Sequence, residues 1–403
     1  MTLTATDIAA PLAAYARRLH AVAGAGHQVL SPLGAWLLLA LLGPASTEET
    51  RPSLNAALGC DVAGAAELAA GLLTDPHPVV PAAAAVWHAA GVTDAVARWL
   101  AGLPAAVETG PVPDQAGADR WARDHTLGLI KDFPVTLDPS VWLVAATALA
   151  TRVSWERPFD VAPASALGPA SPWAGQISRV LRTPDGPGHQ QFIAATHAAG
   201  DVAVHTARAR HGLQVTSVIA APGVGSGDVL AAAYGLAAAL AAGAAVRRRS
   251  LFDLPLGNGP AWTISERTEV TTAGPERCTA VLPAWSARSE QDLSDPSLGF
   301  AAALSALAPG DPWEARQAAM ARYNRTGFEA AAVTGAVAAM AMRVPRPRLV
   351  RSAELRFGHP YAVVAVVTGP GPGQAPAASG SPWAGLPVFS AWVAQPEDAD
   401  PED

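Results

Sequence analysis

The first sixty residues carry apolar positions at helical spacing. Four of them form one face of a helix predicted over residues 7–22: Ile8, Leu12, Tyr15 and Leu19. A second helix is predicted from Pro32 to about Leu42, because Ser31 is a helix-capping residue and proline suits a first helical turn. This segment is apolar on nearly every side, which is typical of a buried helix. A third helix opens at residues 47–50 and ends near Gly59, a residue type that often terminates helices.

Later in the chain, short apolar runs predict strands. They cover residues 82–87, 213–220, 263–271, 278–287, 313–324, 355–357, 361–367 and 387–394, with helices between them at 119–130, 228–241 and 298–307. The almost continuously apolar stretch 141–150 favours a central strand covered on both faces. Early helices followed by strands indicate one α+β domain over residues 1–403. The Gly/Pro/Ala-rich segment 369–385 is interpreted as a flexible hairpin tip.

One segment near the C-terminal end has unusually small side chains. In an extended conformation, Phe328, Ala330, Ala332 and Thr334 would face one way, and Glu329, Ala331, Val333 and Gly335 the other. Small residues let a backbone enter a tight space, because each larger side chain must find room in a packed interior. The segment is a loop that could become a strand. The alternative stays open, since alanine is abundant throughout the chain.

Composition narrows the function classes. Half of the 403 residues are hydrophobic, 15% are charged and the net charge is −7, which disfavours a nucleic-acid surface. Lys131 is the only lysine among abundant Ala, Gly, Pro and Val, a bias typical of a high-GC, bacterial genome. Cys60 and Cys278 form no CxxC pair, so buried free thiols are expected, and a single bridge stays open. No signal-peptide pattern or membrane span is recognised, which favours the cytoplasm, with an extracellular location open.

Common catalytic and cofactor motifs are mostly absent from the sequence. The sequence contains no GxSxG elbow, HExxH pair or Walker loop. The glycine-rich run 223–227 departs from the dinucleotide fingerprint, because Asp228 stands where the third glycine belongs. The histidines lack the spacing of helical metal ligands. We therefore predict no enzyme activity, no metal and no cofactor, although a Ser/His/Asp triad assembled in space stays open.

Several segments, in order along the chain, together resemble the serpin family of serine protease inhibitors. Residues 27–42 resemble a serpin strand that ends in Ser-Pro before a buried helix, and 147–160 resemble a strand of the large sheet with its Trp-Glu-Arg-Pro-Phe ending. The remaining matching positions are Thr50, Arg51, Leu54, Leu58, Gly59, Trp121, Thr126, Gly128, Ile130, 282–285, Ser289, Glu290, Asp292, Leu293, 327–334, 357–361 and 388–396. The likeness spans about residues 8–396 and is weakest over 161–275.

The resemblance implies a fold and a mechanism. The fold would be one α+β serpin domain with a large central sheet, two smaller sheets, eight or nine helices and an exposed reactive loop at about 326–352. A serine protease would cleave that loop and form an acyl-enzyme, after which the loop would insert into the large sheet. The hinge that inserts first would comprise Gly327, Phe328, Glu329, Ala330, Ala331, Ala332, Val333 and Thr334. The positions that control sheet opening would be Ser31, Thr147, Trp155 and Gln317.

The target follows from where the loop would be cut. Counting from the hinge places the scissile bond at Ala341–Met342, which suits an elastase-like or subtilisin-like protease. A cut after Arg343 would instead suit a trypsin-like protease. We expect a monomer that binds neither nucleic acid nor membrane.

Departures from the family pattern leave a second function open. Phe328 stands where serpins prefer Thr or Ser, and Arg325 where they usually have Glu. Thr147 and Gln317 replace the usual Asn and His, whereas Trp155 is retained. Phe328 would stabilise the inserted strand if it fits and slow insertion if it clashes. The alternative is a non-inhibitory protein of this fold that binds a ligand or is merely cleaved.

Overall fold

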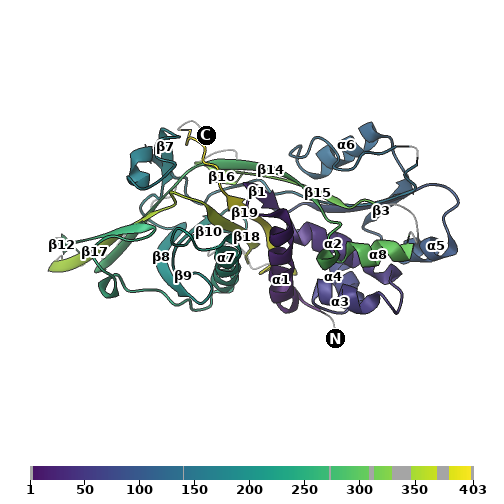
Figure 1. The fold of residues 1–403 in the computed structure, drawn as a ribbon, viewed down its shortest axis with the longest axis horizontal. Helices are drawn as coiled ribbons and strands as arrows, with labels where there is room; N and C mark the ends of the chain where they lie inside the picture. The colour runs from purple at the N-terminus through teal and green to yellow at the C-terminus, as the bar shows by residue number, and fades with distance from the viewer. Residues whose placement is uncertain are drawn as a thin grey trace. The chain divides into compact units, whose positions relative to one another are not determined.

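The structure is a computed structural model that describes residues 3–138, 140–271, 274–307, 313–328, 346–369 and 381–400 (Figure 1). The chain divides into two compact units, each built from three separate segments. Unit 1 comprises residues 1–152, 287–320 and 365–391, and unit 2 comprises 153–286, 321–364 and 392–403. We describe each unit by itself. The single domain predicted for residues 1–403 stays a prediction.

Unit 1 is mainly helical. Its helices are α1 (Ala5–Ala23), α2 (Pro32–Leu42), α3 (Arg51–Leu58), α4 (Val62–Thr74), α5 (Asp94–Ala101), α6 (Gln115–His125) and α8 (Phe300–Leu307), with the 3₁₀ turns η1 (Gly43–Ala45) and η4 (Pro296–Leu298). Its own strands are β1 (Gln28–Leu30), β2 (Ala82–His88), β3 (Val107–Pro111) and β4 (Leu143–Leu149). All residues of α2 are buried, and Ser31 caps the helix by accepting from the amide of Gly34, as the sequence predicts.

The sheet of unit 1 places its apolar side against α6. Strand β2 pairs with β3 in parallel and with β4 antiparallel. Trp87 of β2 and Trp121 of α6 meet edge to face, with ring centroids 5.4 Å apart, and Phe133 packs beside them. Val144, Ala146 and Ala148 of β4 complete this core.

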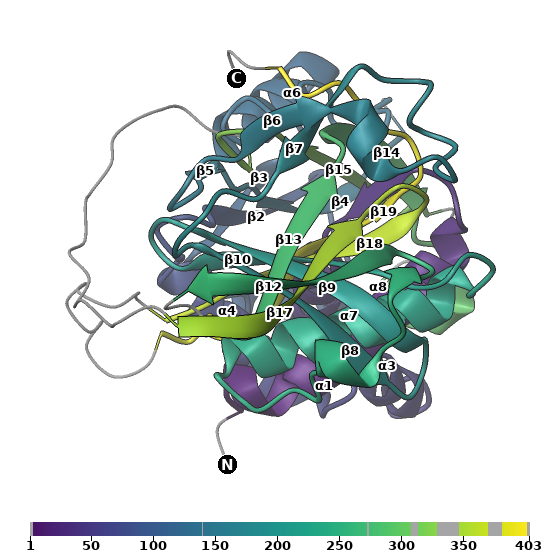
Figure 2. The ribbon, with the colours of Figure 1, turned by 90° about the vertical axis from the view of Figure 1, so that its left-hand side faces the viewer.

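Unit 2 is mainly β. Its strands are β5 (Val153–Ser154), β6 (Asp160–Pro163), β7 (Arg179–Arg182), β8 (His189–Thr196), β9 (Gly200–Ala209), β10 (Leu213–Ile219), β11 (Gly257–Asn258), β12 (Trp262–Thr271), β13 (Glu276–Leu282), β16 (Gly327–Phe328) and β17 (Arg346–Arg356). Strands β8, β9 and β10 pair antiparallel, and α7 (Ser226–Ala241) packs on β10. A six-stranded sheet has the order β11-β12-β17-β13-β7-β6 (Figure 2). The 3₁₀ turns of this unit are η2 (Ala164–Leu167) and η3 (Leu251–Asp253).

Four further strands have residues in both units: β14 (Trp285–Asp292), β15 (Arg316–Tyr323), β18 (Tyr361–Val367) and β19 (Pro387–Val393). The bounds of β18 are those predicted, and the described residues contain eight α-helices, in agreement with the eight or nine expected. Strand 141–150, however, is not covered on both faces as predicted. Along β4, buried residues alternate with half-buried ones, because the strand borders a cavity in unit 1.

Two segment boundaries also differ from the prediction. The reactive loop was expected to reach residue 352, but β17 begins at Arg346 and gains its backbone hydrogen bonds from β12 and β13. The hairpin tip predicted at 369–385 is ordered at its end, where residues 381–385 form a turn. Trp383 in that turn is buried and donates to the carbonyl oxygen of Asp75 at 2.8 Å. The remaining part, 370–380, lies outside the described residues.

Both cysteines are free and half-buried rather than fully buried. Burial raises the pKa of the Cys60 thiol to about 11 and that of Cys278 to about 12, so both are protonated at neutral pH. No single helix in the described part is long and apolar enough to span a membrane, while the bent pair α3–α4 meets that test by length and composition alone.

Candidate functional site

The predicted hinge begins as a strand in unit 2. Strand β16 lies between β15 and β5, because Phe328 pairs with Tyr323 on one side and with Val153 on the other. Gly327 pairs with Ser154 in the same ladder. The other hinge residues, 329–334, lie outside the described residues, as do the scissile-bond candidates Ala341, Met342 and Arg343. The first two hinge residues are therefore already inserted between two strands.

A tight turn leads into β16. The Asn324 side-chain oxygen accepts from the amides of Thr326 (3.1 Å) and Gly327 (2.9 Å). The indole N–H of Trp155 donates to the carbonyl oxygen of Asn324 at 3.0 Å, and the amide of Trp155 to that of Thr326 at 2.9 Å. Asn324 is buried and its side chain shapes this turn, a role that was not predicted from the sequence. An Asn placed three residues before a Gly was the available signal for this turn.

Phe328 fits among the aromatic residues of unit 2. Its side chain is 3% exposed and meets the indole of Trp285 edge to face, with centroids 6.3 Å apart. Trp285 in turn stacks on Tyr323 at 5.9 Å, and Trp155 lies 4.9 Å from the same tyrosine. These four residues (Trp155, Trp285, Tyr323 and Phe328) are named the aromatic cluster. The departure from Thr or Ser at 328 thus produces a packed side chain and not a clash in the intact chain.

A pair of buried histidines contacts the residues that follow β5, beside the aromatic cluster. His189 Nε2 lies 2.8 Å from the carbonyl oxygen of Arg157, which can only accept, so this nitrogen carries the proton. His189 Nδ1 must then accept from His205 Nε2, 3.1 Å away. Burial lowers the pKa of both imidazoles, that of His205 well below its ordinary value. The sequence contained no sign of this pair, because only the pairing of β8 with β9 brings the two residues together.

In unit 1, two predicted sheet-opening positions meet the start of α2. Gln317 forms two hydrogen bonds with the backbone of Ser31, accepting from its amide at 3.0 Å and donating to its carbonyl oxygen at 2.8 Å. Thr147 of β4 donates to the carbonyl oxygen of Gly34 at 2.8 Å, and the hydroxyl of Ser31 donates to that of Val388 at 3.0 Å. Ser31, Thr147 and Gln317 are named the polar cluster. Trp155, the fourth predicted position, belongs to the aromatic cluster instead.

A cavity of about 580 Å³ lies beside the polar cluster within unit 1. Its walls are β4 on one side and residues 313–320, which include the first part of β15, on the other. In the described structure, β4 and β15 belong to different hydrogen-bonded sheets. The backbone edges that face the cavity therefore belong to two strands that are not hydrogen-bonded to each other in the described structure. A cavity between two such edges can accept an additional strand.

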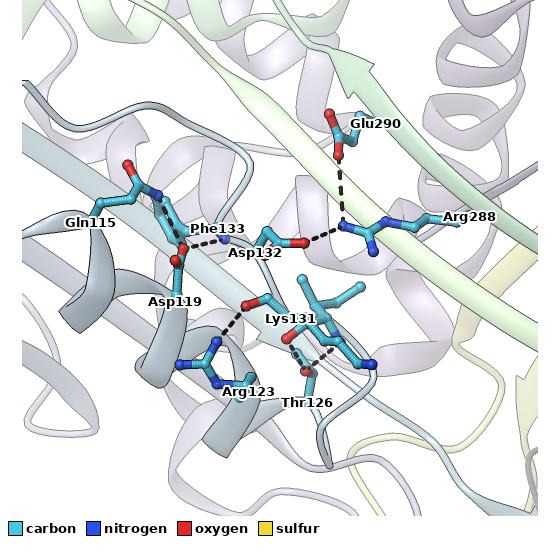
Figure 3. A network of polar contacts seen from close by, with 10 residues as sticks. Gln115, Asp119, Arg123, Thr126, Lys131, Asp132, Phe133, Arg288 and Glu290 are labelled. Atoms are coloured by element: carbon cyan, nitrogen blue, oxygen red, sulfur yellow. Dashed lines mark hydrogen bonds and ion pairs between the residues drawn. The ribbon is translucent and has the colours of Figure 1, made fainter.

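Helix α6 and the residues after it cover the cavity. Asp119 accepts from the amide of Phe133 at 2.9 Å, which is the main reason that its pKa is lowered, and from Gln115 at 3.1 Å (Figure 3). Thr126 accepts from the amide of Ile130 at 3.0 Å. An ion pair between Arg288 of β14 and Asp132 at 3.2 Å joins this cover to the neighbouring strand (Figure 3). The packing of Trp121 and Phe133 on the sheet and a contact between His125 of α6 and Glu108 of β3 at 3.0 Å also hold it.

No group of three or more His, Cys, Asp or Glu side chains suited to a metal ion occurs among the residues that the structure describes. Among the described residues of unit 1, the cavity thus lies between two strand edges that are not paired with each other.

Searches with the sequence gave no match, either to models of known families or to curated proteins. Solved structures do match over nearly the whole chain. A thermophilic serpin in its native state, tengpin, has a TM-score of 0.65 at 13% identity, with 98% of this chain and 95% of that chain covered. A cleaved serpin named Serpin 42Da has a TM-score of 0.62 at 14% identity, covering 98% of each chain. Human thyroxine-binding globulin in complex with thyroxine has a TM-score of 0.63 at 12% identity, with 97% of this chain and 99% of that chain covered.

Proposed function

Because the chain has the serpin fold, we propose that it inhibits a serine protease as a suicide substrate. Cleavage of the loop that follows Phe328 would form an acyl-enzyme, and the cut loop would then enter the cavity between β4 and β15 as a new strand. The observation that carries this proposal is the position of β16, which already lies between β15 and β5. Insertion would add further residues to the hydrogen-bonded ladder that β16 forms with β15 and β5.

The existing pairs fix the register of that extension. Tyr323 pairs with Phe328, so six residues further along an uninterrupted ladder Gln317 would lie opposite Thr334. On the other side Val153 pairs with Phe328, and the same count brings Thr147 opposite Thr334. Both counts meet at one residue, although they start on different strands. Thr334 would therefore enter between the two side chains that bond to the start of α2.

The side chains on the inserted strand suit the two faces that would receive them. Ala330, Ala332 and Thr334 would follow Phe328 on its face, where small residues avoid overpacking. Thr334 would bring a hydroxyl to the polar cluster, where Thr147 and Gln317 offer hydrogen-bonding groups. Each new backbone hydrogen bond contributes about 0.5–1.5 kcal/mol net. The intact chain stores this free energy, and cleavage releases it.

A second function is a binding protein that keeps the fold without inhibiting. The insertion of Phe328 in the intact chain favours it, because a buried aromatic side chain holds the start of the loop inside the sheet. A loop held in this way reaches less far toward a protease. Thyroxine-binding globulin, one of the matching structures, carries a small molecule, and this second proposal assigns such a role to the present chain.

Mixing the protein with elastase, subtilisin and trypsin in turn, followed by denaturing gels, separates the two functions. A band at the summed mass that survives SDS is expected for an inhibitor, because the acyl bond is covalent. Complete cleavage with fully active protease would overturn the proposal. Sequencing the released C-terminal peptide would assign the cut to Ala341–Met342 or to the bond after Arg343, and so name the protease class.

A further inference from the structure

Unit 2 contains a two-stranded ribbon that extends past its sheet. Strands β12 and β17 pair without a break from Trp262↔Leu355 to Thr271↔Arg346. Strand β13 joins β17 only from Arg351 onward, where it pairs with Glu276. Residues 267–271 and 346–350 therefore have only each other as strand partners in the described sheet (Figure 1, Figure 2). We name these two segments the ribbon.

One face of the ribbon is apolar and exposed. Val270 is 69% exposed and Leu349 is 46% exposed, and both are large hydrophobic side chains. Val270 pairs with Pro347, and Leu349 is two residues further along the same strand, so these side chains share one face. On the other face Glu269 forms ion pairs with Arg267 and, at 2.8 Å, with Arg277. Glu269 is thus paired with cations of β12 and β13, whereas Val270 and Leu349 on the apolar face are exposed.

The apolar face ends at a fixed polar boundary. Arg351 pairs with Glu266 at 2.7 Å and also donates to the carbonyl oxygens of Leu251 and Leu254. Exposed apolar groups on a ribbon of this kind invite association, and natural sheet edges usually carry charges that prevent it. A bounded apolar patch of this kind is typical of an interaction surface.

The short stretch of chain between the ribbon and the scissile bond points to the protease as the partner. Leu349 follows Arg343 by six residues, so it lies no more than about 20 Å from a bond cut there, even with the chain fully extended. A protease bound to its substrate in a standard interface covers about 800 Å² on each partner. A protease that holds the scissile bond therefore has its own surface within reach of the ribbon. Residues 346–350 of the ribbon lie on the C-terminal side of the cut, which is the side of the leaving amine, and residues 267–271 lie on the N-terminal side.

We propose that Val270, Leu349 and Pro347 form a docking surface for apolar side chains on the attacking serine protease, next to the part of its cleft that receives the leaving fragment. This inference rests on the proposed cleavage of the loop and adds a site that selects the protease. The scissile peptide bond breaks as the ester bond forms to the residue on the N-terminal side of the cut, and the leaving amine, at the start of the segment that leads into β17, takes the proton. The ribbon therefore affects the rate of loop cleavage. It does not affect whether the acyl-enzyme is later trapped or released.

The test compares full-length wild type with the double variant Val270→Thr/Leu349→Thr, since threonine keeps the strand propensity while removing apolar surface. Leu256→Thr serves as the matched control, because Leu256 is 52% exposed but lies outside the ribbon. The readout is the second-order rate of loop cleavage by whichever of subtilisin, elastase or trypsin cuts wild type fastest. We expect a loss of roughly five- to thirty-fold for the double variant and no change for the control.

Two further readouts make the result specific. The loss should persist in 1 M NaCl, because an apolar contact is not screened by salt. The fraction of cleaved protein that ends in the SDS-stable complex should stay at the wild-type value. Thr268→Val, which enlarges the apolar face opposite Leu349, should raise the cleavage rate and provides a gain-of-function variant.

An unchanged cleavage rate in the double variant, or an equal loss in Leu256→Thr, would overturn the docking surface. Failure of the inhibitory function is a separate outcome, because it abolishes the SDS-stable band and leaves the cleavage-rate difference measurable. A lower trapped fraction at an unchanged rate would also contradict the proposal.

Discussion

The aromatic cluster of unit 2 and the polar cluster of unit 1 both take side chains from β15, but they differ in what occupies the space beside that strand. Next to Tyr323, a two-residue strand has entered and its Phe328 is buried. Next to Gln317 lies a cavity of about 580 Å³. Beside Tyr323, the chain has already entered a sheet. Beside Gln317, the cavity offers space for further residues of the loop. We infer that the aromatic cluster anchors the loop and the polar cluster controls how far it proceeds.

The largest expected effect on stability comes from removing the buried side chain of Phe328. Phe328→Ala removes a buried ring and leaves a cavity, so the free energy of unfolding of the intact protein should fall by about 3–5 kcal/mol. Denaturant unfolding measures it, with Leu256→Ala as an exposed control expected to change stability by less than about 0.5 kcal/mol. A loss as small as the control's would mean that Phe328 does not hold the start of the loop.

Acid should weaken the two units through different histidines. His20 of unit 1 is buried against the hydroxyl of Ser390, and burial lowers its pKa from the usual 6.5 to about 4. A lowered folded pKa means that the unfolded chain binds the proton more readily, so stability is lost as pH falls from about 6.5 toward 4. The loss is roughly 3 kcal/mol by pH 4, at about 1.4 kcal/mol per pKa unit. In unit 2, His189 and His205 act in the same direction, beside Arg157 and Asp160.

Denaturant unfolding at pH 7 and pH 4.5 tests this account. His20→Gln and His205→Gln should each reduce the difference in stability between the two pH values, because each removes one buried titrating group. A pH difference that neither variant changes would show that other groups cause the acid sensitivity.

A smaller effect is expected at the polar cluster. Gln317→Leu leaves the amide and carbonyl oxygen of Ser31 without their side-chain partner, which should cost about 1–3 kcal/mol of stability. Thr147→Val should cost less, about 0.5–1.5 kcal/mol, because it removes a single hydrogen bond to Gly34. A loss in Thr147→Val as large as that in Gln317→Leu would contradict this difference between two backbone hydrogen bonds and one.

The smallest effect should come from the cover. Arg288→Gln breaks the ion pair with Asp132, whose side chains are 44% and 71% exposed, so stability should change by no more than about 1 kcal/mol. If the cover must lift for a strand to enter, however, the same variant should speed trapping of a protease. Stopped-flow measurement of trapping would detect this, and a slower reaction would contradict it.

Local signals made parts of the fold predictable. Ser31 and Pro32 define the start of α2, and the continuous apolar run of β18 defines its bounds, because caps and burial act over a few residues. The start of β17 was missed, since its Arg- and Pro-rich sequence is typical of a loop and only the ladder with β12 makes it a strand. Strands β8 and β9 were missed for a similar reason, as their buried polar side chains hide the period-two pattern.

The same limit applied to the candidate site. The family resemblance predicts Thr147 and Gln317 as sheet-opening positions, and that role stays a prediction. Their hydrogen bonds to Gly34 and Ser31 became visible only in the structure. Asn324 and the His189–His205 pair were missed, because their roles depend on partners that only the folded chain brings near. Whether Phe328 would fit depended on Trp285 and Tyr323, and their arrangement was not readable from sequence.

The most direct test of loop insertion is the melting temperature before and after cleavage. The loop is cut with a protease, the protease is removed, and intact and nicked protein are heated under the same conditions. The account predicts a sharply higher melting temperature for the nicked protein, because residues after Phe328 then pair with β4 and β15. An unchanged or lower melting temperature would show that the cavity does not receive the loop, and would contradict the proposed mechanism.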